Sequence, residues 1–154
     1  YCNFPFPISV NAQKKPVAKG VLKKQPNALQ FESYANTRLA NKRKNRKYLE
    51  GYLSAYILVR PPSEETRKRM DVHNYHKLLL DVLTVNQVYR DDSQITYLQI
   101  GFSDSIPTMT IPYIRTVKGM ERSVDVCGGC AIMLYEGTAN AEHNIILALP
   151  DQWD

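Results

Sequence analysis

Long hydrophobic runs are missing from this 154-residue sequence. The longest apolar stretches, residues 131–135 and 145–149, have the length of a β-strand, whereas a membrane-spanning helix needs about 20 apolar residues. We therefore expect a soluble protein with no membrane partner. With 44% hydrophobic and 23% charged residues, the composition is globular and excludes a disordered or fibrous chain. The length predicts a single domain over residues 1–154 with its own core.

Cysteine is also scarce. Three cysteines, an odd number, exclude a framework in which every cysteine forms a disulfide. Cys127 and Cys130 have the spacing of half a zinc site, but a structural zinc ion needs four ligands, and no second CxxC or HxxxH follows. Cys2 and His143 would complete the site only if the fold brought them together. The main alternative is a plain turn at the two glycines between Cys127 and Cys130.

Acidic residues are rare in the first half of the sequence, where basic residues are concentrated. Residues 1–70 hold 15 Lys and Arg but 4 Asp and Glu, a net charge of +11, whereas residues 71–154 hold 5 against 11, a net −6. A basic half beside an acidic half suits a nucleic acid partner and a separate group of carboxylates. An unevenly charged, solvated surface would have the same distribution, so charge alone leaves both interpretations open.

Hydrophobic periodicity predicts an α/β fold of α+β-like character, with a small mixed β-sheet and two main helices. Apolar residues that recur every three to four positions predict the helices, at 31–48 and 74–85. Runs rich in β-branched and aromatic residues predict strands, at 52–59, 95–102, 124–136 and 144–149. Two prolines restrict residues 1–10 to an edge strand. Pro, Gly and charged residues predict loops, at 11–30, 63–70 and 103–123, with a hairpin as the alternative for the last.

Three aspartates, Asp71, Asp91 and Asp92, flank the predicted helix 74–85. An aspartate before a helix is often an N-cap, and an Asp-Asp-Ser sequence often forms a turn. A helix of this length spans about 18 Å, so the three side chains meet only if the chain after the helix folds back along it, or if the next strand begins beside Asp71. From the residue types alone, capping and catalysis both stay open.

A longer pattern around these aspartates is similar to a family signature: Asp-x-Asp-Asn, a lysine three residues later, an Asp-x-Leu, and an Asp-Asp followed by two polar residues and an apolar one. The matching residues are Asp71-Val72-His73-Asn74, Lys77, Asp81-Val82-Leu83 and Asp91-Asp92-Ser93-Gln94-Ile95. Pro7-Ile8-Ser9-Val10-Asn11 resembles the start of the same family. The chain thus resembles the RusA family of Holliday junction resolvases over most of residues 4–102 and again near 131–136.

The resemblance implies a homodimeric, Mg²⁺-dependent endonuclease that resolves four-way DNA junctions by paired symmetric nicks, in recombination and repair. It implies a cytoplasmic location in a bacterial or phage-infected cell. Asp71 and Asp92 would be metal ligands, with Asp91 a catalytic neighbour of Asp92. Lys77 would be the cation near the scissile phosphate, and Asn74 would position Asp71 or the DNA. Carboxylate-bound metal ions can activate water and relieve the charge of such a transition state.

His73 departs from the family pattern, which has an aspartate at this position. Mg²⁺ prefers oxygen ligands, whereas imidazole suits softer metals such as Mn²⁺. Three interpretations stay open. His73 is a third metal ligand that shifts the preference toward Mn²⁺, or it is a general base or hydrogen-bond donor. In the third, it marks a weakened metal site in a protein that binds junctions without cutting them.

Basic side chains would supply affinity for DNA by contacting phosphates without reading the sequence. The predicted DNA contacts are Asn11, Lys14, Lys15, Lys19, Lys23, Lys24, Lys42, Arg43, Lys44, Arg46, Lys47, Arg67, Lys68, Arg69 and Asn74. Because a junction has near two-fold symmetry, a two-fold dimer would place one active site on each of two strands. The alternatives are a non-catalytic DNA- or RNA-binding protein of the same fold, another RNA-binding protein such as a ribosome-associated one, and a zinc-stabilised module.

Overall fold

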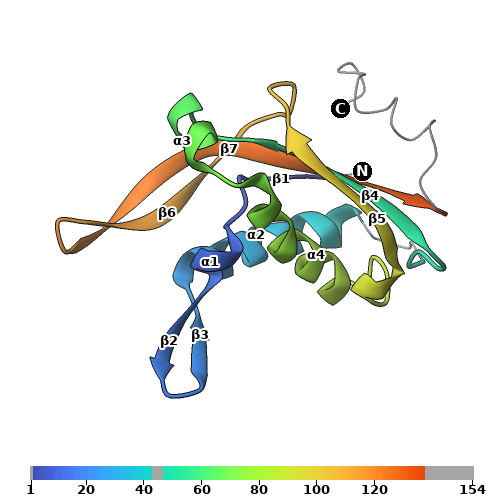
Figure 1. Cartoon of the computed structure of the whole chain (residues 1–154), viewed down its shortest axis with the longest axis horizontal. Helices are drawn as coiled ribbons and strands as arrows, with labels where there is room; N and C mark the ends of the chain where they lie inside the picture. The colour runs from blue at the N-terminus through green and yellow to red at the C-terminus, as the bar shows by residue number, and fades with distance from the viewer. Residues whose placement is uncertain (1, 43–46, 138–154) are drawn as a thin grey trace.

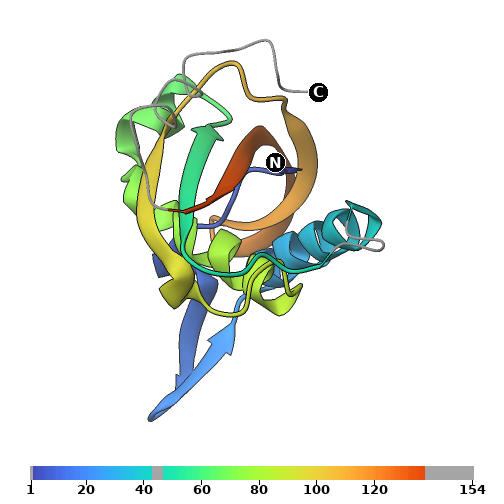
Figure 2. The same ribbon diagram turned by 90° about the vertical axis from the view of Figure 1, so that its right-hand side faces the viewer.

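A curved β-sheet carries two helices on one face (Figures 1 and 2). The computed structural model describes residues 2–42 and 47–137. The central strand is β4, Leu53–Arg60, in which all residues but the last are buried. A strand that is covered on both faces has no need for alternating polar residues, which explains the nearly continuous apolar run in its sequence.

The other strands of this sheet place β4 at its centre. β5, Ile95–Phe102, pairs with β4 in parallel, and β7, Met120–Glu136, pairs with it antiparallel. β1, Cys2–Phe4, pairs with the far side of β7, so the order is β1-β7-β4-β5. The predicted mixed sheet, the α/β class and the edge position of the first strand are confirmed.

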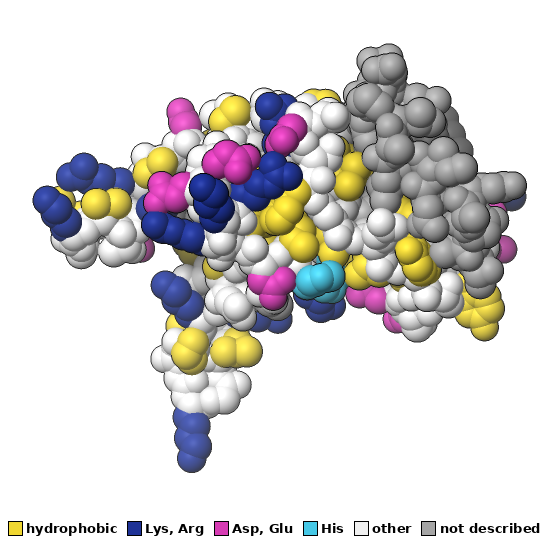
Figure 3. Space-filling view, turned by 45° about the horizontal axis from the view of Figure 1, so that its top comes forward, with side chains coloured by type: hydrophobic (Ala, Val, Ile, Leu, Met, Phe, Trp, Pro, Cys, Tyr) yellow, Lys and Arg dark blue, Asp and Glu magenta, His cyan; other side chains and the backbone are white. Residues whose placement is uncertain are grey.

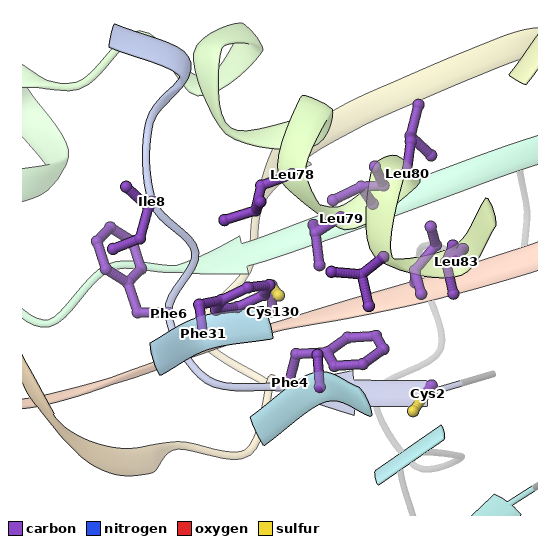
Figure 4. Packing of buried hydrophobic residues seen from close by; sticks show 14 of the residues in the cluster. Cys2, Phe4, Phe6, Ile8, Phe31, Leu78, Leu79, Leu80, Leu83 and Cys130 are labelled. Carbon is purple, nitrogen blue, oxygen red and sulfur yellow. The ribbon is translucent and has the colours of Figure 1, made fainter. Parts of the chain in front are cut away.

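Two amphipathic helices, α2 (Pro26–Lys42) and α4 (His76–Val85), cover one face of the sheet. Figure 4 shows their apolar side chains meeting those of β1 and β7 in one core. The rings of Phe4 and Phe31, for example, have centroids 6.3 Å apart, and both residues are fully buried. Each large apolar side chain buried in this way stabilises the fold by about 1.5–3 kcal/mol. The core therefore fixes where the polar face of α4 points.

The predicted loop at residues 11–30 is wrong, because most of this segment is regular. Its elements are α1 Val10–Gln13, β2 Lys14–Ala18 and β3 Val21–Lys24. β2 and β3 form a separate antiparallel hairpin that projects from the body (Figure 1). Every β2 residue is exposed, so the prediction that little is buried was correct. The two strands pair through their backbones and are joined by a turn at Gly20, whose φ is +76°, a conformation that glycine adopts readily.

Residues 103–123 form much of a long hairpin, the alternative that the sequence left open, rather than a loop. β6, Met109–Val117, pairs with β7 through its whole length. Lys118 and Gly119 connect the two strands, and their φ angles of 51° and 76° are those of a tight two-residue hairpin turn. Pro112 is compatible with β6 because this strand has a partner on one side only.

The CxxC sequence is neither a turn nor, among the residues that the structure describes, part of a group of three or more possible metal ligands. Cys127 is exposed and Cys130 is buried, and β7 continues through the two glycines between them. A Cβ on Gly129 would lie 2.4 Å from the carbonyl oxygen of Pro107. The predicted turn is therefore wrong, and a glycine is required here for the close approach of two backbone segments.

The first predicted helix, 31–48, is shifted toward the N-terminus. It begins at Pro26, because proline is well suited to the first helical position, where its missing N–H is not needed. It extends to Lys42, and Tyr48 lies outside it. Residues 43–46 lie outside the described part of the chain.

The predicted loop at 63–70 is also wrong, because it contains a short helix, α3 (Glu64–Arg69). The hydroxyl of Ser63 caps this helix by accepting a hydrogen bond from the backbone N–H of Thr66 at 3.1 Å. Acidic residues occupy its first turn and basic residues its last, which suits the helix dipole. The predicted strand 144–149 lies outside the described residues. Within residues 2–42 and 47–137, no helix is long and apolar enough to cross a membrane.

Candidate active site

The polar side chains of helix α4 lie in a row along one face. Lys77, Asp81 and Thr84 are four and three positions apart, the spacing at which helical side chains are neighbours. The residues that pack against the core from the other side of the helix are Leu78, Leu79, Leu80, Val82 and Leu83. Burial of this apolar side therefore holds the three polar side chains at the protein surface.

A short turn that follows the helix, η2 (Asp92–Gln94), brings Asp92 beside this row. The side chain of Asp91 accepts a hydrogen bond from the backbone N–H of Ser93 at 2.7 Å. The side-chain oxygen of Gln94 in turn accepts one from the backbone N–H of Asp91 at 3.2 Å, which completes a capping box. The chain thus folds back along α4, one of the two arrangements that the sequence left open.

Two hydroxyl groups hold the carboxylate of Asp92. Its Oδ1 atom lies 2.8 Å from the hydroxyl of Thr84 and 3.1 Å from the hydroxyl of Tyr89. Tyr89 is fully buried, and this burial raises the pKa of its phenol well above the ordinary value. The phenol therefore stays protonated and can donate to Asp92. Both hydroxyls also lie 3.1 Å from the carbonyl oxygen of Leu80, which ties the group to the backbone of α4.

The ammonium group of Lys77 is shared by two carboxylates. Its Nζ atom lies 2.6 Å from Oδ1 of Asp81 and 3.6 Å from Oδ2 of Asp92. The hydrogen bond to Asp81 is the largest cause of a raised pKa for Lys77, so the side chain stays cationic. The predicted catalytic residues Lys77 and Asp92 are thus brought together. Asp81 was noticed in the sequence motif but not predicted as a site residue, although its position one turn after Lys77 was a usable signal.

Asp71 lies just before the helix, where it caps the 3-10 turn η1 (Val72–Tyr75) that precedes α4. Its carboxylate accepts hydrogen bonds from the backbone N–H of His73 at 3.1 Å and from the side-chain amide of Asn74 at 3.4 Å. The predicted contact between Asn74 and Asp71 is therefore present. The side chains of Asp71 and His73 are exposed. The Nδ1 atom of His76 lies 2.5 Å from the backbone carbonyl oxygen of His73.

The predicted metal ligands Asp71, His73 and Asp92 are not gathered around one point. In the described part of the chain, no three His, Cys, Asp or Glu side chains are close enough to hold one metal ion. Asp92 contacts Lys77 in the first turn of α4, whereas Asp71 caps the 3-10 turn that precedes the helix. Asp91 caps its own turn, and hydrogen bonds from the side chain and backbone of Ser93 lower its pKa.

A cleft of about 550 Å³ lies beside the helix and collects most of these acidic side chains. Its lining residues are Lys24, Glu32, Asn36, Asp81, Val82, Thr84, Val85, Asp91 and Asp92. Lys24 is the last residue of β3 and forms an ion pair with Glu32 of α2. The cleft therefore lies between the carboxylates of α4 and η2 on one side and the base of the β2–β3 hairpin on the other.

The donor set at Asp81 and Asp92 suits a hard divalent cation. Mg²⁺ is commonly held by one or two carboxylates, together with water and substrate phosphates. The ammonium group of Lys77 shows that both carboxylates can face one positive charge. Asp81 and Asp92, which both contact Lys77, are therefore a candidate pair of ligands, and the part of Asp71 and His73 in metal binding stays a prediction.

Apart from Lys24 and Asn74, which are described above, the predicted DNA contacts fall into four groups. Four lysines, Lys14, Lys15, Lys19 and Lys23, are exposed on the β2–β3 hairpin. Two arginines of α3 are paired with acidic side chains: Arg67 lies 3.2 Å from Glu64, and Arg69 lies 2.6 Å from Glu65. Exposed residues elsewhere are Asn11, Lys42, Lys47 and Lys68. Arg43, Lys44 and Arg46 lie outside the described residues. The hairpin thus holds the densest group of predicted contacts within the described residues.

Comparison with known proteins adds one finding. The family model described as endodeoxyribonuclease RusA matches residues 5–112, which is more than half of the chain. The match includes the β2–β3 hairpin, both core helices and the site residues Lys77, Asp81 and Asp92. No curated protein matches the sequence.

Proposed function

The chain belongs to the RusA family of endodeoxyribonucleases, hydrolases that cut DNA phosphodiester bonds, and from this premise we propose that it cleaves four-way junctions with a divalent metal ion at Asp81 and Asp92. The observation that carries the proposal is the ammonium group of Lys77, placed between these two carboxylates at the edge of an acidic cleft. A nuclease needs this combination, because both a metal ion and a fixed cation reduce the charge of a pentacovalent phosphate.

Each side chain of the site has a distinct role in this proposal. Asp81 and Asp92 hold the metal ion, which when bound supplies an activated water and a Lewis acid for the scissile phosphate. Thr84 and Tyr89 hold Oδ1 of Asp92, so its Oδ2 is directed toward Lys77. Lys77 exchanges its contact with the carboxylates for one with the phosphate, and its positive charge stabilises the transition state.

For the residues at the start of the helix, we propose the roles that the family resemblance implies. Asp71 and His73 are exposed, and Asn74 already contacts Asp71, so this group is available to the DNA backbone or to a metal ion. Mg²⁺ is the proposed metal, with Mn²⁺ as the alternative if His73 is a ligand. Asp91 acts by fixing the turn that carries Asp92.

We also propose a homodimer, because paired symmetric nicks need two active sites related by a two-fold axis. The proposed setting is recombination and repair in the cytoplasm of a bacterial or phage-infected cell. A second candidate function is junction binding with little or no cleavage. His73 favours this candidate, since an imidazole stands where the family pattern has a carboxylate, and Mg²⁺ prefers oxygen ligands.

Cleavage of an end-labelled four-way junction, beside a linear duplex of the same arm sequence, tests the proposal in Mg²⁺ and separately in Mn²⁺. We expect paired nicks in the junction, loss of cleavage in Asp92→Asn, and normal cleavage in Asp104→Asn. The control removes an exposed carboxylate that is paired with Arg67 of α3 and does not line the cleft. Tight junction binding without nicks in either metal would establish the second candidate instead.

A further inference from the structure

The β2–β3 hairpin has no part in the core of the protein. All five β2 residues are exposed, and so are Val21, Leu22 and Lys23 of β3. An isolated two-stranded hairpin is only marginally stable in water. The β2–β3 hairpin is a separate sheet, and burial of its own side chains does not stabilise it. Its side chains are therefore available for a ligand.

The charges of this hairpin are arranged unfavourably for the protein alone. Lys14 lies opposite Lys24 and Lys15 lies opposite Lys23, and like charges directly across an antiparallel pair are destabilising. Lys19 adds another positive charge at the tip, and residues 14–24 contain no acidic residue. Among the described residues, Lys24 is the one hairpin lysine with a compensating ion pair, which it forms with Glu32. A polyanion would relieve this repulsion, whereas an apolar or cationic partner would not.

Three apolar side chains are exposed between these lysines. Val17, Val21 and Leu22 have 58%, 52% and 63% of their surface accessible, and the strand register places them near the tip. Figure 3 shows hydrophobic and basic side chains on the surface of the projecting hairpin. Apolar side chains flanked by lysines suit a partner that has phosphates at its edges and apolar base surfaces between them. The major groove of duplex DNA has this chemistry, because thymine methyl groups are exposed in it, and it is wide enough for a two-stranded β-ribbon.

From this combination we propose that the β2–β3 hairpin enters the major groove of the duplex arm next to the cut, with its lysines on the phosphates and its apolar tip on the base edges. The proposal rests on the proposed nuclease function, because it takes DNA as the substrate. Lys24 at the hairpin base lines the acidic cleft, so the ribbon begins at the cutting site. Five strand residues extend about 16 Å, which corresponds to about five base pairs.

Two hairpin variants and one matched control test this inference by junction binding, in the Asp92→Asn background so that no DNA is cut. Lys15→Ala/Lys19→Ala/Lys23→Ala removes three charges from the hairpin. We expect the slope of log affinity against log salt to fall by about three, since each lost phosphate contact contributes about one. The control removes three charges from the β6–β7 hairpin, at Arg115, Lys118 and Arg122, and should leave the slope unchanged.

The second variant, Val17→Thr/Val21→Thr/Leu22→Thr, places β-branched threonine, which suits a strand, at all three positions and removes apolar surface. We expect weaker binding, by about tenfold, with an unchanged salt slope. Circular dichroism and thermal unfolding should match the parent protein, because all three side chains are exposed. The variant therefore separates apolar contact with the bases from attraction to the phosphates.

Dimethyl sulfate modification then locates the groove. Guanine N7 lies in the major groove and adenine N3 in the minor groove. We expect protection of guanine N7 within about five base pairs of the cut site, lost in both hairpin variants. Protection of adenine N3 instead, or equal losses of affinity in the control and the lysine variant, would overturn the inference. A parent protein that binds no DNA would instead contradict the proposed nuclease function, so the two failures are distinguishable.

Discussion

The buried hydroxyl of Tyr89 lies 3.1 Å from Oδ1 of Asp92, a carboxylate that lines the acidic cleft. The phenol ring belongs to the core, so packing of the core determines where its hydroxyl lies. The hydroxyl is in turn one of two groups that orient the carboxylate toward Lys77. Tyr89 is thus a positioning residue: it links the hydrophobic core to the chemistry without contacting the phosphate.

Removal of this hydroxyl, in Tyr89→Phe, should lower the cleavage rate by about 10-fold to 100-fold, the usual effect of losing a group that orients a metal ligand. The matched control is Tyr113→Phe, which removes another buried hydroxyl, 2.7 Å from the carbonyl oxygen of Phe6. We expect both variants to lose about 1–3 kcal/mol of unfolding free energy. Single-turnover cleavage at increasing metal concentration should separate them, because only Tyr89→Phe should need more metal. Equal kinetics in both would remove Tyr89 from the site.

Asp81→Asn tests the carboxylate that the sequence did not single out. We expect Asp81→Asn to reduce the cleavage rate by at least about 10-fold to 100-fold, the effect of losing a group that orients a metal ligand. The substitution weakens the cation site and leaves Lys77 with a neutral neighbour. Junction affinity should be unchanged or higher, since a negative charge is removed from a DNA-binding surface. Asp125→Asn, which changes an exposed aspartate in β7, is the control. Normal cleavage by Asp81→Asn would leave Asp92 without its proposed partner.

The raised pKa of Lys77 gives a prediction about pH. The hydrogen bond to Asp81 raises this pKa, so the stabilising ion pair is fully present below the ordinary pKa of lysine and is lost as the pH rises through the folded-state value. Cleavage by the wild type and by Lys77→Met should therefore differ by a constant factor between about pH 7 and pH 9. Lys118→Met should follow the wild type throughout. A ratio that changes within this range would show that Lys77 titrates there.

The core and the cleft differ in how far the sequence determines them. Apolar spacing in α4 and the apolar run of β4 predicted their elements closely, because burial imposes a period on the sequence. The resemblance to the RusA family, carried by the segment around Asp71 and Asp92, is confirmed by the family match. The fold class and the type of enzyme were therefore predictable.

Features that depend on the approach of distant segments were not predictable. The β2–β3 hairpin buries almost nothing, so no hydrophobic pattern marks it. The two glycines of the CxxC sequence indicated a turn, although they serve a strand that passes close to another backbone segment. The spacing of Asp81, one turn after Lys77, indicated that these two side chains are neighbours, but the distance from Lys77 to Asp92 depends on how the chain folds back along α4. A single sequence does not contain such distances.

His73 provides a test of the metal site. The sequence left open whether this side chain is a ligand that shifts the preference toward Mn²⁺, whereas the proposed pair of ligands is Asp81 and Asp92. We expect His73→Asp to leave the ratio of cleavage rates in Mg²⁺ and Mn²⁺ unchanged within about twofold. A clear shift toward Mg²⁺ would place His73 among the ligands. His76→Asp, three residues later in the chain, is the control for added negative charge.

Gly129 tests the close approach at the centre of β7. A Cβ at this position would lie 2.4 Å from the carbonyl oxygen of Pro107, which is backbone and cannot rotate away. Gly129→Ala should therefore lower the unfolding free energy by about 1–3 kcal/mol, the usual effect of overpacking in a core. In Gly101→Ala, a β5 variant whose Cβ would meet nothing within 4 Å, we expect little change. Urea unfolding of both variants measures the difference, and equal midpoints would mean that the Pro107 segment moves away without loss of stability.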